Sequence, residues 1–254
     1  MTPPFRTAAA LSGIPHGFFG RQGGVSIGEL ASLNTGIGSG DDAHAIAENR
    51  RRVADAVLPG APLVGVYQVH GRDCALVDAP WDEAHRPHAD ALVTDRPGVL
   101  LGILTADCAP VLLADADAGV VGAVHAGWKG ALAGVTDAAV AAMVQLGAES
   151  ARITAAIGPC IGAASYEVDT AFVDRFVAAD PANDHFFRAG RPGHALFDIA
   201  AYVAARLAAA GVTQIEILGD DTYALDADYF SYRRACHIQE NGYGRQLSVI
   251  GLAA

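Results

Sequence analysis

Apolar residues recur at helical spacing in several stretches of the chain, which predicts helices at 42–58, 130–146, 169–179 and 198–210. In the first stretch, Ile46, Val53 and Val57 share one face, with Asp residues just before the stretch and a Pro-Gly pair just after it. Gly147 and Gly211 follow the second and fourth stretches as helix stops. These helices are amphipathic, so each is expected to cover one face of a larger core.

Between the helical stretches, short apolar runs predict strands at 62–69, 74–78, 90–94, 99–104, 109–114, 119–125, 151–157, 213–218 and 246–251. The turn sequence DADAG at 115–119 predicts that the strands on either side of it form a hairpin. Several strands follow one another without an intervening helix, so a regular βαβ array is not expected. The sequence predicts an α+β fold of mixed sheets with helices outside, as a single domain over 1–254.

Composition narrows the classes of partner. Hydrophobic residues make up 52% of the chain and charged residues 18%, which is typical of a folded protein. The 17 Lys and Arg against 28 Asp and Glu give a formal charge of −11, which disfavours binding to nucleic acid or to an anionic membrane. A small-molecule substrate is the better expectation, and any anionic substrate requires a local basic pocket. The oligomeric state cannot be predicted from these features.

The sequence also favours a reducing location. The apolar part of the amino-terminal segment, 8–11, is too short for a secretory signal, and acidic residues and prolines interrupt the longest apolar region, 97–126. The four cysteines lie far apart with no Cys-x-x-Cys pair, so they are expected to be free thiols. We therefore expect a cytoplasmic protein.

Three predicted strands deliver a potential metal ligand near their ends, in the segments QVHG, TADC and VHAG. The ligands are His70, Cys108 and His125. Two imidazoles and one thiolate form a donor set suited to zinc, although copper is also compatible, and three protein ligands leave a fourth position for water. The spacing matches no short zinc motif, and from spacing alone a buried cysteine beside a core histidine is the commoner arrangement.

The turn after His125 adds a candidate anion site. Residues 127–130 lie between a predicted strand and a predicted helix, where unpaired N–H groups favour negative charge. Lys129 adds a cation there. The alternative is that Lys129 is an exposed surface residue and Trp128 fills the core.

The chain resembles the YfiH-type laccase-domain family, formerly described as multicopper polyphenol oxidases. The resemblance rests on motifs distributed along nearly the whole chain, namely HGFFGRQGGVS, SLN, ENR, QVHG, TADCAPVLL, HAGWKG, IGPCIG, YEV and SYRR. It implies a four-layer α/β/β/α arrangement and a metal, usually zinc, bound by His70, Cys108 and His125. The activity it implies is phosphorolysis of adenosine, inosine and methylthioadenosine, with adenosine deamination as a further reaction. The segment 235–244 is longer than the usual family connection.

This chemistry assigns expected roles to further residues. His70, Cys108 and His125 are candidate catalytic residues through the metal, and Asp107 is a candidate because it adjoins Cys108, unless it points to the opposite face. The candidate substrate-binding residues are cations that can clamp phosphate and an amide that can bond ribose or phosphate; they are Arg50, Lys129, Arg233 and Asn34. The expected partners are a nucleoside and phosphate.

Other functions remain open from the sequence. A laccase-type oxidase with several coppers is disfavoured, because the chain has nine histidines and no His-x-His pair. A Cys–His hydrolase would use Cys108 as nucleophile and His125 as base. Some relatives are described as peptidoglycan editing factors, and no residue here discriminates that activity. A non-catalytic metal-binding protein is the remaining alternative, although structural zinc sites usually have four protein ligands.

Overall fold

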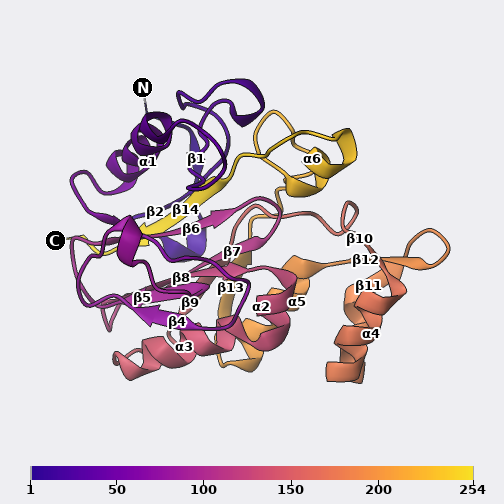
Figure 1. Ribbon diagram of the computed structural model, residues 1–254. Helices are drawn as coiled ribbons and strands as arrows, with labels where there is room; N and C mark the ends of the chain where they lie inside the picture. Colours follow the sequence, from indigo (N-terminus) through magenta and orange to yellow (C-terminus); the bar gives the residue numbers. More distant parts are fainter. Residues whose placement is uncertain (1, 254) are drawn as a thin grey trace.

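The computed structural model describes residues 2–253, and two β-sheets form its centre (Figure 1). The five-stranded sheet has the order β1 (Phe5–Arg6), β2 (His16–Phe19), β14 (Gln246–Gly251), β6 (Leu100–Thr105) and β3 (Leu63–Val64). The six-stranded sheet has the order β13 (Gln214–Ile217), β9 (Thr154–Ile157), β7 (Ala109–Asp115), β8 (Val120–Ala126), β5 (Ala91–Thr94) and β4 (Cys74–Leu76). Both sheets contain parallel and antiparallel pairs, as the sequence predicted.

Helices cover the outer faces of the two sheets. Helix α1 (Ala43–Val57) packs on the five-stranded sheet, against β14 and β2. Helices α2 (Trp128–Ala133), α3 (Val135–Gln145) and α5 (Ile199–Ala209) lie on the other side of the molecule, against the six-stranded sheet (Figure 1). The expected four-layer α+β fold is therefore confirmed.

A smaller unit extends from the side of the six-stranded sheet. It consists of a three-stranded sheet of β10 (Glu167–Asp169), β12 (His194–Phe197) and β11 (Phe187–Ala189), together with α4 (Thr170–Ala179) (Figure 1). Helix α6 (Tyr232–Ile238), just before β14, lies on the same side of the molecule as this unit (Figure 1). Arg233 of α6 donates to the backbone carbonyl of Glu167 in β10. The remaining helical segments are short 3₁₀ turns at Ala9–Leu11, Gly28–Leu30, Glu83–His85 and Pro181–Phe186.

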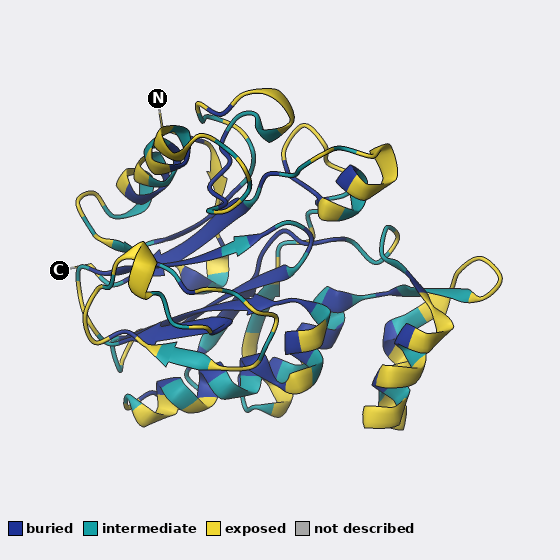
Figure 2. Cartoon of the chain, in the orientation of Figure 1, coloured by how far each residue is buried: buried dark blue, intermediate teal, exposed yellow. Residues whose placement is uncertain are grey.

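The strands of the two central sheets are mostly buried (Figure 2). Successive side chains along a strand point to opposite faces of its sheet, so they enter two different apolar clusters. On β6, Leu101 and Ile103 face the six-stranded sheet, where they join Leu112 of β7 in one buried cluster. The preceding residue, Leu100, points to the opposite face and joins a separate cluster under α1. Because both faces of β6 are covered, its sequence is continuously apolar, which explains why the run at 99–104 shows no polar alternation.

The structure corrects several predicted boundaries. The predicted helix 130–146 is two helices, because Gly134 adopts a left-handed conformation with φ of 92° between α2 and α3. Of the predicted strand 62–69, only Leu63–Val64 pairs in the sheet; further along, the side-chain amide of Gln68 bonds the backbone of Leu104 instead. The strands β1, β2, β10, β11 and β12 and the helix α6 were not predicted.

The predicted hairpin is confirmed. Strands β7 and β8 pair antiparallel from Ala109↔Ala126 to Asp115↔Val120, with the DADAG turn between them. The Asp115 carboxylate accepts hydrogen bonds from the backbone N–H groups of Asp117 and Ala118, which closes the turn. This register fixes His125 near the end of β8, beside the start of β7 and the Cys108 loop that precedes it.

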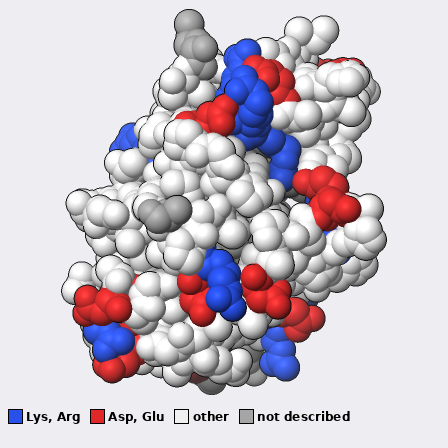
Figure 3. All heavy atoms as spheres, turned by 90° about the vertical axis from the view of Figure 1, so that its left-hand side faces the viewer, with Lys and Arg blue, Asp and Glu red and all other residues white. Residues whose placement is uncertain are grey.

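The surface is acidic overall but mixed locally. On the face shown in Figure 3, basic and acidic side chains lie beside one another and no broad basic patch is present. On α1, Arg51 pairs with Glu48 and Asp55 across one helical turn. Of the helices between residues 2 and 253, none combines the length and the apolar character needed to cross a membrane. The single-domain interpretation of 1–254 stays a prediction, and its two end residues lie outside the described range.

Candidate active site

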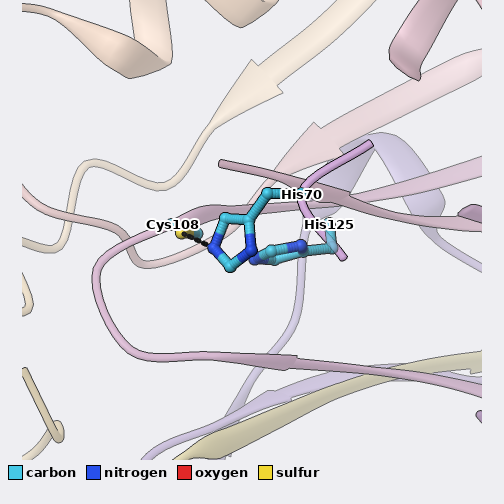
Figure 4. Close-up of side chains that lie close together, drawn as sticks. All are labelled: His70, Cys108 and His125. Carbon is cyan, nitrogen blue, oxygen red and sulfur yellow. Dashed lines mark hydrogen bonds between the residues drawn. The ribbon is translucent and has the colours of Figure 1, made fainter. Parts of the chain in front are cut away.

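His70, Cys108 and His125 converge at one end of the two central sheets (Figure 4). One potential ligand atom from each residue lies within 4.8 Å of those of the other two. The Cys108 Sγ is 3.9 Å from His70 Nε2, and the two imidazole rings are edge to face with centroids 4.8 Å apart. Three segments that are distant in sequence therefore present one thiol and two imidazoles to a common point.

Asp90 holds both His70 and His125 in position. Its side chain is fully buried, and it accepts backbone hydrogen bonds from Val69, His70 and Gly71 at 2.6–3.1 Å. The same carboxylate is 2.7 Å from His125 Nδ1. One carboxylate thus fixes the backbone that carries His70 and orients the His125 ring so that its Nε2 is free to act as a ligand, an arrangement common around metal-binding histidines.

The backbone around His70 is unusual and depends on two glycines. His70 has a φ of 58°, a left-handed conformation that is uncommon outside glycine and that the three hydrogen bonds to Asp90 stabilise. A Cβ at Gly127 would lie 2.8 Å from His70 Cδ2 and 3.1 Å from Cys108 Sγ, and a Cβ at Gly130 would lie 2.6 Å from the Gly71 carbonyl oxygen. The glycines of HAGWKG therefore let β8 and α2 approach the cluster closely.

Cys108 and His125 stabilise each other's charged forms. Burial opposes ionisation of the Cys108 thiol, but the neighbouring His125 and His70 outweigh it and lower the pKa of Cys108 to about 6. Burial likewise opposes charge on His125, whereas Cys108 and Asp90 outweigh it and raise the pKa of His125 to about 9. The thiolate that a metal or an electrophile requires is therefore available at neutral pH.

The difference in pKa between Cys108 and the other buried cysteines predicts that Cys108 is alkylated selectively. After chelator treatment at pH 7, iodoacetamide should modify Cys108 much faster than Cys74, because burial raises the pKa of Cys74 to about 12, and faster than Cys160, whose pKa burial also raises. Because the pKa of Cys108 is lowered, its rate should fall only below about pH 6. Mass spectrometry of tryptic peptides measures each site. Added zinc should protect Cys108 from alkylation. Equal alkylation rates at Cys74 and Cys108 would contradict a lowered pKa for Cys108.

The donor atoms of the three side chains, one sulfur and two imidazole nitrogens, are suited to binding a metal ion. A tetrahedral zinc site with one sulfur and two nitrogens needs ligand atoms separated by about 3.3–3.6 Å. The 3.9 Å between Cys108 Sγ and His70 Nε2 is close to this spacing, and His125 is backed by a buried carboxylate. Among residues 2–253, no fourth Asp, Glu, His or Cys joins the group, which is typical of catalytic rather than structural zinc sites.

A cavity of about 620 Å³ opens directly onto the cluster. The three cluster residues form part of its wall, and the remaining lining residues are Ile37, Gly38, Val66, Tyr67, Gln68, Arg86, Leu104, Thr105, Ala106, Tyr232, Tyr243 and Arg245. Its volume is in the range of pockets that enclose small ligands. Tyr232 and Tyr243 lie with ring centroids 5.0 Å apart, so one wall is aromatic.

Asp107 has a structural position beside the site. Like His70 it has a positive φ, here 84°. Its carboxylate accepts hydrogen bonds from the hydroxyls of Thr222 and Ser231 and from the backbone N–H of Arg233, at 2.7–2.9 Å. Asp107 therefore anchors the first turn of α6 to the Cys108 loop. These contacts occupy both carboxylate oxygens, so the expected catalytic role stays a prediction and the anchoring role is what the geometry supplies.

Two of the four predicted substrate-binding residues lie outside the cavity near α1. Asn34 is fully buried, donates to Ser39 and Asp41, and accepts from the backbone of Gly36 and Arg245. Arg50 forms an ion pair with Glu83 at 3.1 Å. Neither residue contributes to the cavity wall, so direct contact with substrate stays a prediction for both.

Lys129 and Arg233 also lie away from this cavity. Lys129 is exposed, with its Nζ 5.5 Å from the Trp128 ring centroid. Arg233 donates to the backbone carbonyl of Glu167 at 2.8 Å and lies over the Tyr166 ring, where it lines a different, more open cavity. The SYRR segment forms the start of α6 rather than an extended strand, which turns Arg233 toward that second cavity.

Sequence reasoning missed Asp90 and Arg245. The available signal for Asp90 was a carboxylate at the start of a fully apolar run, a position that requires buried hydrogen-bond partners. Arg245 directly precedes β14, and the resemblance assigned it no role. Cys236 and His237 lie on α6, where the His237 ring bonds the Tyr223 hydroxyl.

Comparison with known proteins places this geometry in context. A family model described as multi-copper polyphenol oxidoreductase laccase matches residues 15–253. A Streptomyces griseus protein named purine nucleoside phosphorylase ORF3 is 46% identical over 90% of this chain and 92% of the relative. A Deinococcus radiodurans protein named purine nucleoside phosphorylase is 42% identical over 94% of this chain and 89% of the relative.

Solved structures show the same fold. YlmD from Geobacillus stearothermophilus superposes with a TM-score of 0.89 at 32% identity, covering 98% of this chain and 99% of that one. A Neisseria meningitidis protein, NMB0706, superposes with a TM-score of 0.88 at 31% identity over all of both chains. The arrangement of sheets and helices described above is therefore shared with these proteins.

Proposed function

The chain belongs to the multi-copper polyphenol oxidoreductase laccase family, and we propose that it is a zinc-dependent enzyme that cleaves purine nucleosides with phosphate. The observation that carries this proposal is a three-donor cluster, without a fourth side chain in the described part of the protein, at the wall of a cavity of about 620 Å³. The names of the relatives support the substrate class. Zinc is proposed over copper because a buried thiolate and two imidazoles suit it in a reducing cytoplasm.

In the proposed reaction an oxygen of hydrogen phosphate bonds to the ribose C1′ while the C1′–N bond breaks, and the proton of hydrogen phosphate ends on the departing purine. The products are the free base and ribose 1-phosphate, or 5-methylthioribose 1-phosphate from methylthioadenosine. The substrates are adenosine, inosine and methylthioadenosine; zinc-assisted deamination of adenosine is proposed as a further reaction. When bound, the metal supplies Lewis acidity at the cavity wall.

The residues of the chain perform the positioning. His70, Cys108 and His125 would hold the metal, and Asp90 keeps the His125 ring in one tautomer and one orientation. The aromatic wall of Tyr232 and Tyr243 offers flat faces on which a purine can stack. Because these groups come from separate segments held by buried contacts, the site is organised before substrate binds.

The test is incubation of the purified, zinc-loaded protein with inosine and phosphate, followed by chromatography for hypoxanthine and ribose 1-phosphate. We expect His70→Ala to reduce kcat/KM by at least about 100-fold, because loss of a ligand exceeds the loss caused by removing a group that only orients one. Arg188→Gln, an exposed substitution on β11, is the control and should retain activity. Absence of both products from the unmodified protein, or equal activity in His70→Ala, would contradict the proposal.

A further inference from the structure

Two of the three residue pairs in the metal cluster have an evident structural link. Cys108 directly precedes β7 and His125 lies near the end of β8, and these two strands pair antiparallel. Asp90 links His70 to His125, because its carboxylate bonds the backbone of the first and the ring of the second. The remaining pair is His70 and Cys108, whose ligand atoms are 3.9 Å apart.

The side chain of Gln68 supplies the third link. Its Nε2 donates to the Leu104 carbonyl at 2.7 Å, and its Oε1 accepts from the Leu104 N–H at 2.9 Å. Because one partner is a carbonyl and the other is an N–H group, a single orientation of the amide satisfies both. Gln68 precedes His70 by two residues, and Leu104 precedes Cys108 by four. One amide therefore ties together the two segments that carry these ligands.

The Gln68 amide takes the place of a strand that ends early. β3 pairs with β6 over only two residues, and on the same edge of β6 the Leu100 N–H donates to the Pro62 carbonyl. Leu104 lies four residues further along β6, so its backbone groups face that same edge beyond the end of β3. The amide satisfies both of these groups, which would otherwise lack a partner in the sheet.

The segment 68–71 has no other hydrogen-bonded attachment on this side. Three of its N–H groups bond Asp90, which lies on the side of His125. Within the described residues 2–253, the Gln68 amide makes the only hydrogen bonds between this segment and β6. The other end of the link is firm, because Asp107 anchors the loop that follows β6 to the first turn of α6.

We propose that Gln68 is a positioning residue for the metal, which sets the separation between His70 and Cys108. This inference rests on the metal site of the proposed function and deepens it. Gln68 supplies no ligand atom and acts through the backbone, because holding the segment 68–71 against β6 keeps the His70 ring beside the Cys108 sulfur. Without the amide, Asp90 still holds His70 toward His125, but the distance from His70 to Cys108 is no longer fixed.

The zinc affinity of Gln68→Met, measured by competition with a chromophoric chelator, tests this role. Met is similar in length and shape but has no amide donor, so the affinity should fall about tenfold, at the low end of the effects of groups that orient metal ligands. Asn183→Leu is the matched control, because Asn183 Nδ2 donates to the backbone carbonyl of Phe176 in α4 at 2.9 Å. Both substitutions should lower the melting temperature of the metal-free protein, and only Gln68→Met should weaken zinc binding.

Cobalt(II) in place of zinc gives a spectrum that a residue with a purely stabilising role would not change. In the unmodified protein we expect a thiolate-to-cobalt absorption band and the strong visible bands of four-coordinate cobalt. In Gln68→Met the thiolate band should persist, because Cys108 stays anchored, and the visible bands should weaken, because His70 moves away. Asn183→Leu should give the spectrum of the unmodified protein.

These measurements use no nucleoside, so they separate the inference from the proposed reaction. Weaker zinc binding and weaker visible cobalt bands in Gln68→Met support the role even if no nucleoside is cleaved, in which case only the proposed function fails. Zinc affinity and a cobalt spectrum equal to those of Asn183→Leu overturn the role and leave the proposed function intact. If the unmodified protein binds no zinc, the inference and the proposed metal dependence are both overturned.

Discussion

Asp90→Asn is expected to remove most of the metal affinity and to destabilise the fold. Asp90 accepts four hydrogen bonds while fully buried, and an amide supplies only one acceptor oxygen. If the amide nitrogen faces His125, the ring must change tautomer and its Nε2 carries the proton instead of a free lone pair. If the amide nitrogen faces the other way, the N–H groups of Val69 and Gly71 lose their acceptor and His70 shifts.

We expect zinc affinity to fall about 10- to 100-fold, and the free energy of unfolding of the metal-free protein to fall by roughly 3–5 kcal/mol. Competition with a chromophoric chelator measures the affinity, and urea unfolding measures the stability. Asp95→Asn is the matched control, because Asp95 is partly exposed and pairs only with Arg96. Zinc affinity in Asp90→Asn equal to that of the control would show that Asp90 does not orient the ligands.

Gly127→Ala should damage the site by adding a single methyl group. The backbone at Gly127, with φ of −69° and ψ of 158°, is accessible to any residue, so the substitution introduces no backbone strain. The new Cβ, however, would lie 2.8 Å from His70 Cδ2 and 3.1 Å from Cys108 Sγ, distances that require both ligands to move. We expect zinc affinity to fall about 10- to 100-fold, with roughly 1–3 kcal/mol lost in stability.

Gly242→Ala is the control for this substitution, since the nearest atom to its Cβ would be 3.9 Å away. Zinc titrations of both variants under the same buffer and temperature compare the two sites directly. If Gly127→Ala binds zinc as tightly as Gly242→Ala, the close packing of HAGWKG against the cluster is not what holds the ligands together.

Local features of the fold could be predicted from the sequence because their partners are close in the chain. Asp42 and Asp198 cap α1 and α5 by accepting the backbone N–H three residues later, as short-range patterns indicate. The β7–β8 hairpin follows from its own turn. The division of the predicted helix 130–146 at Gly134 was missed, because an interior glycine is compatible with either a continuous helix or a break.

The site required long-range contacts that no local pattern contains. The resemblance to a known family brought His70, Cys108 and His125 together, whereas their spacing alone favoured a buried cysteine beside a core histidine. Asp90 was missed because its partners are residues 69–71 and 125, which meet it only in the folded chain. The proposed anion contacts were chosen by charge, whereas packing decides which arginines line the cavity, and these are Arg86 and Arg245.

Zinc X-ray absorption spectroscopy of the purified protein, with metal quantified per chain, tests the central claim most directly. We expect one zinc per chain, with one sulfur at about 2.3 Å, two imidazole nitrogens at about 2.0 Å and one further light atom from solvent. In Cys108→Ser the sulfur should disappear from the zinc shell. A shell of four protein ligands, or a sulfur that persists in Cys108→Ser, would contradict a three-residue site that is open to the cavity.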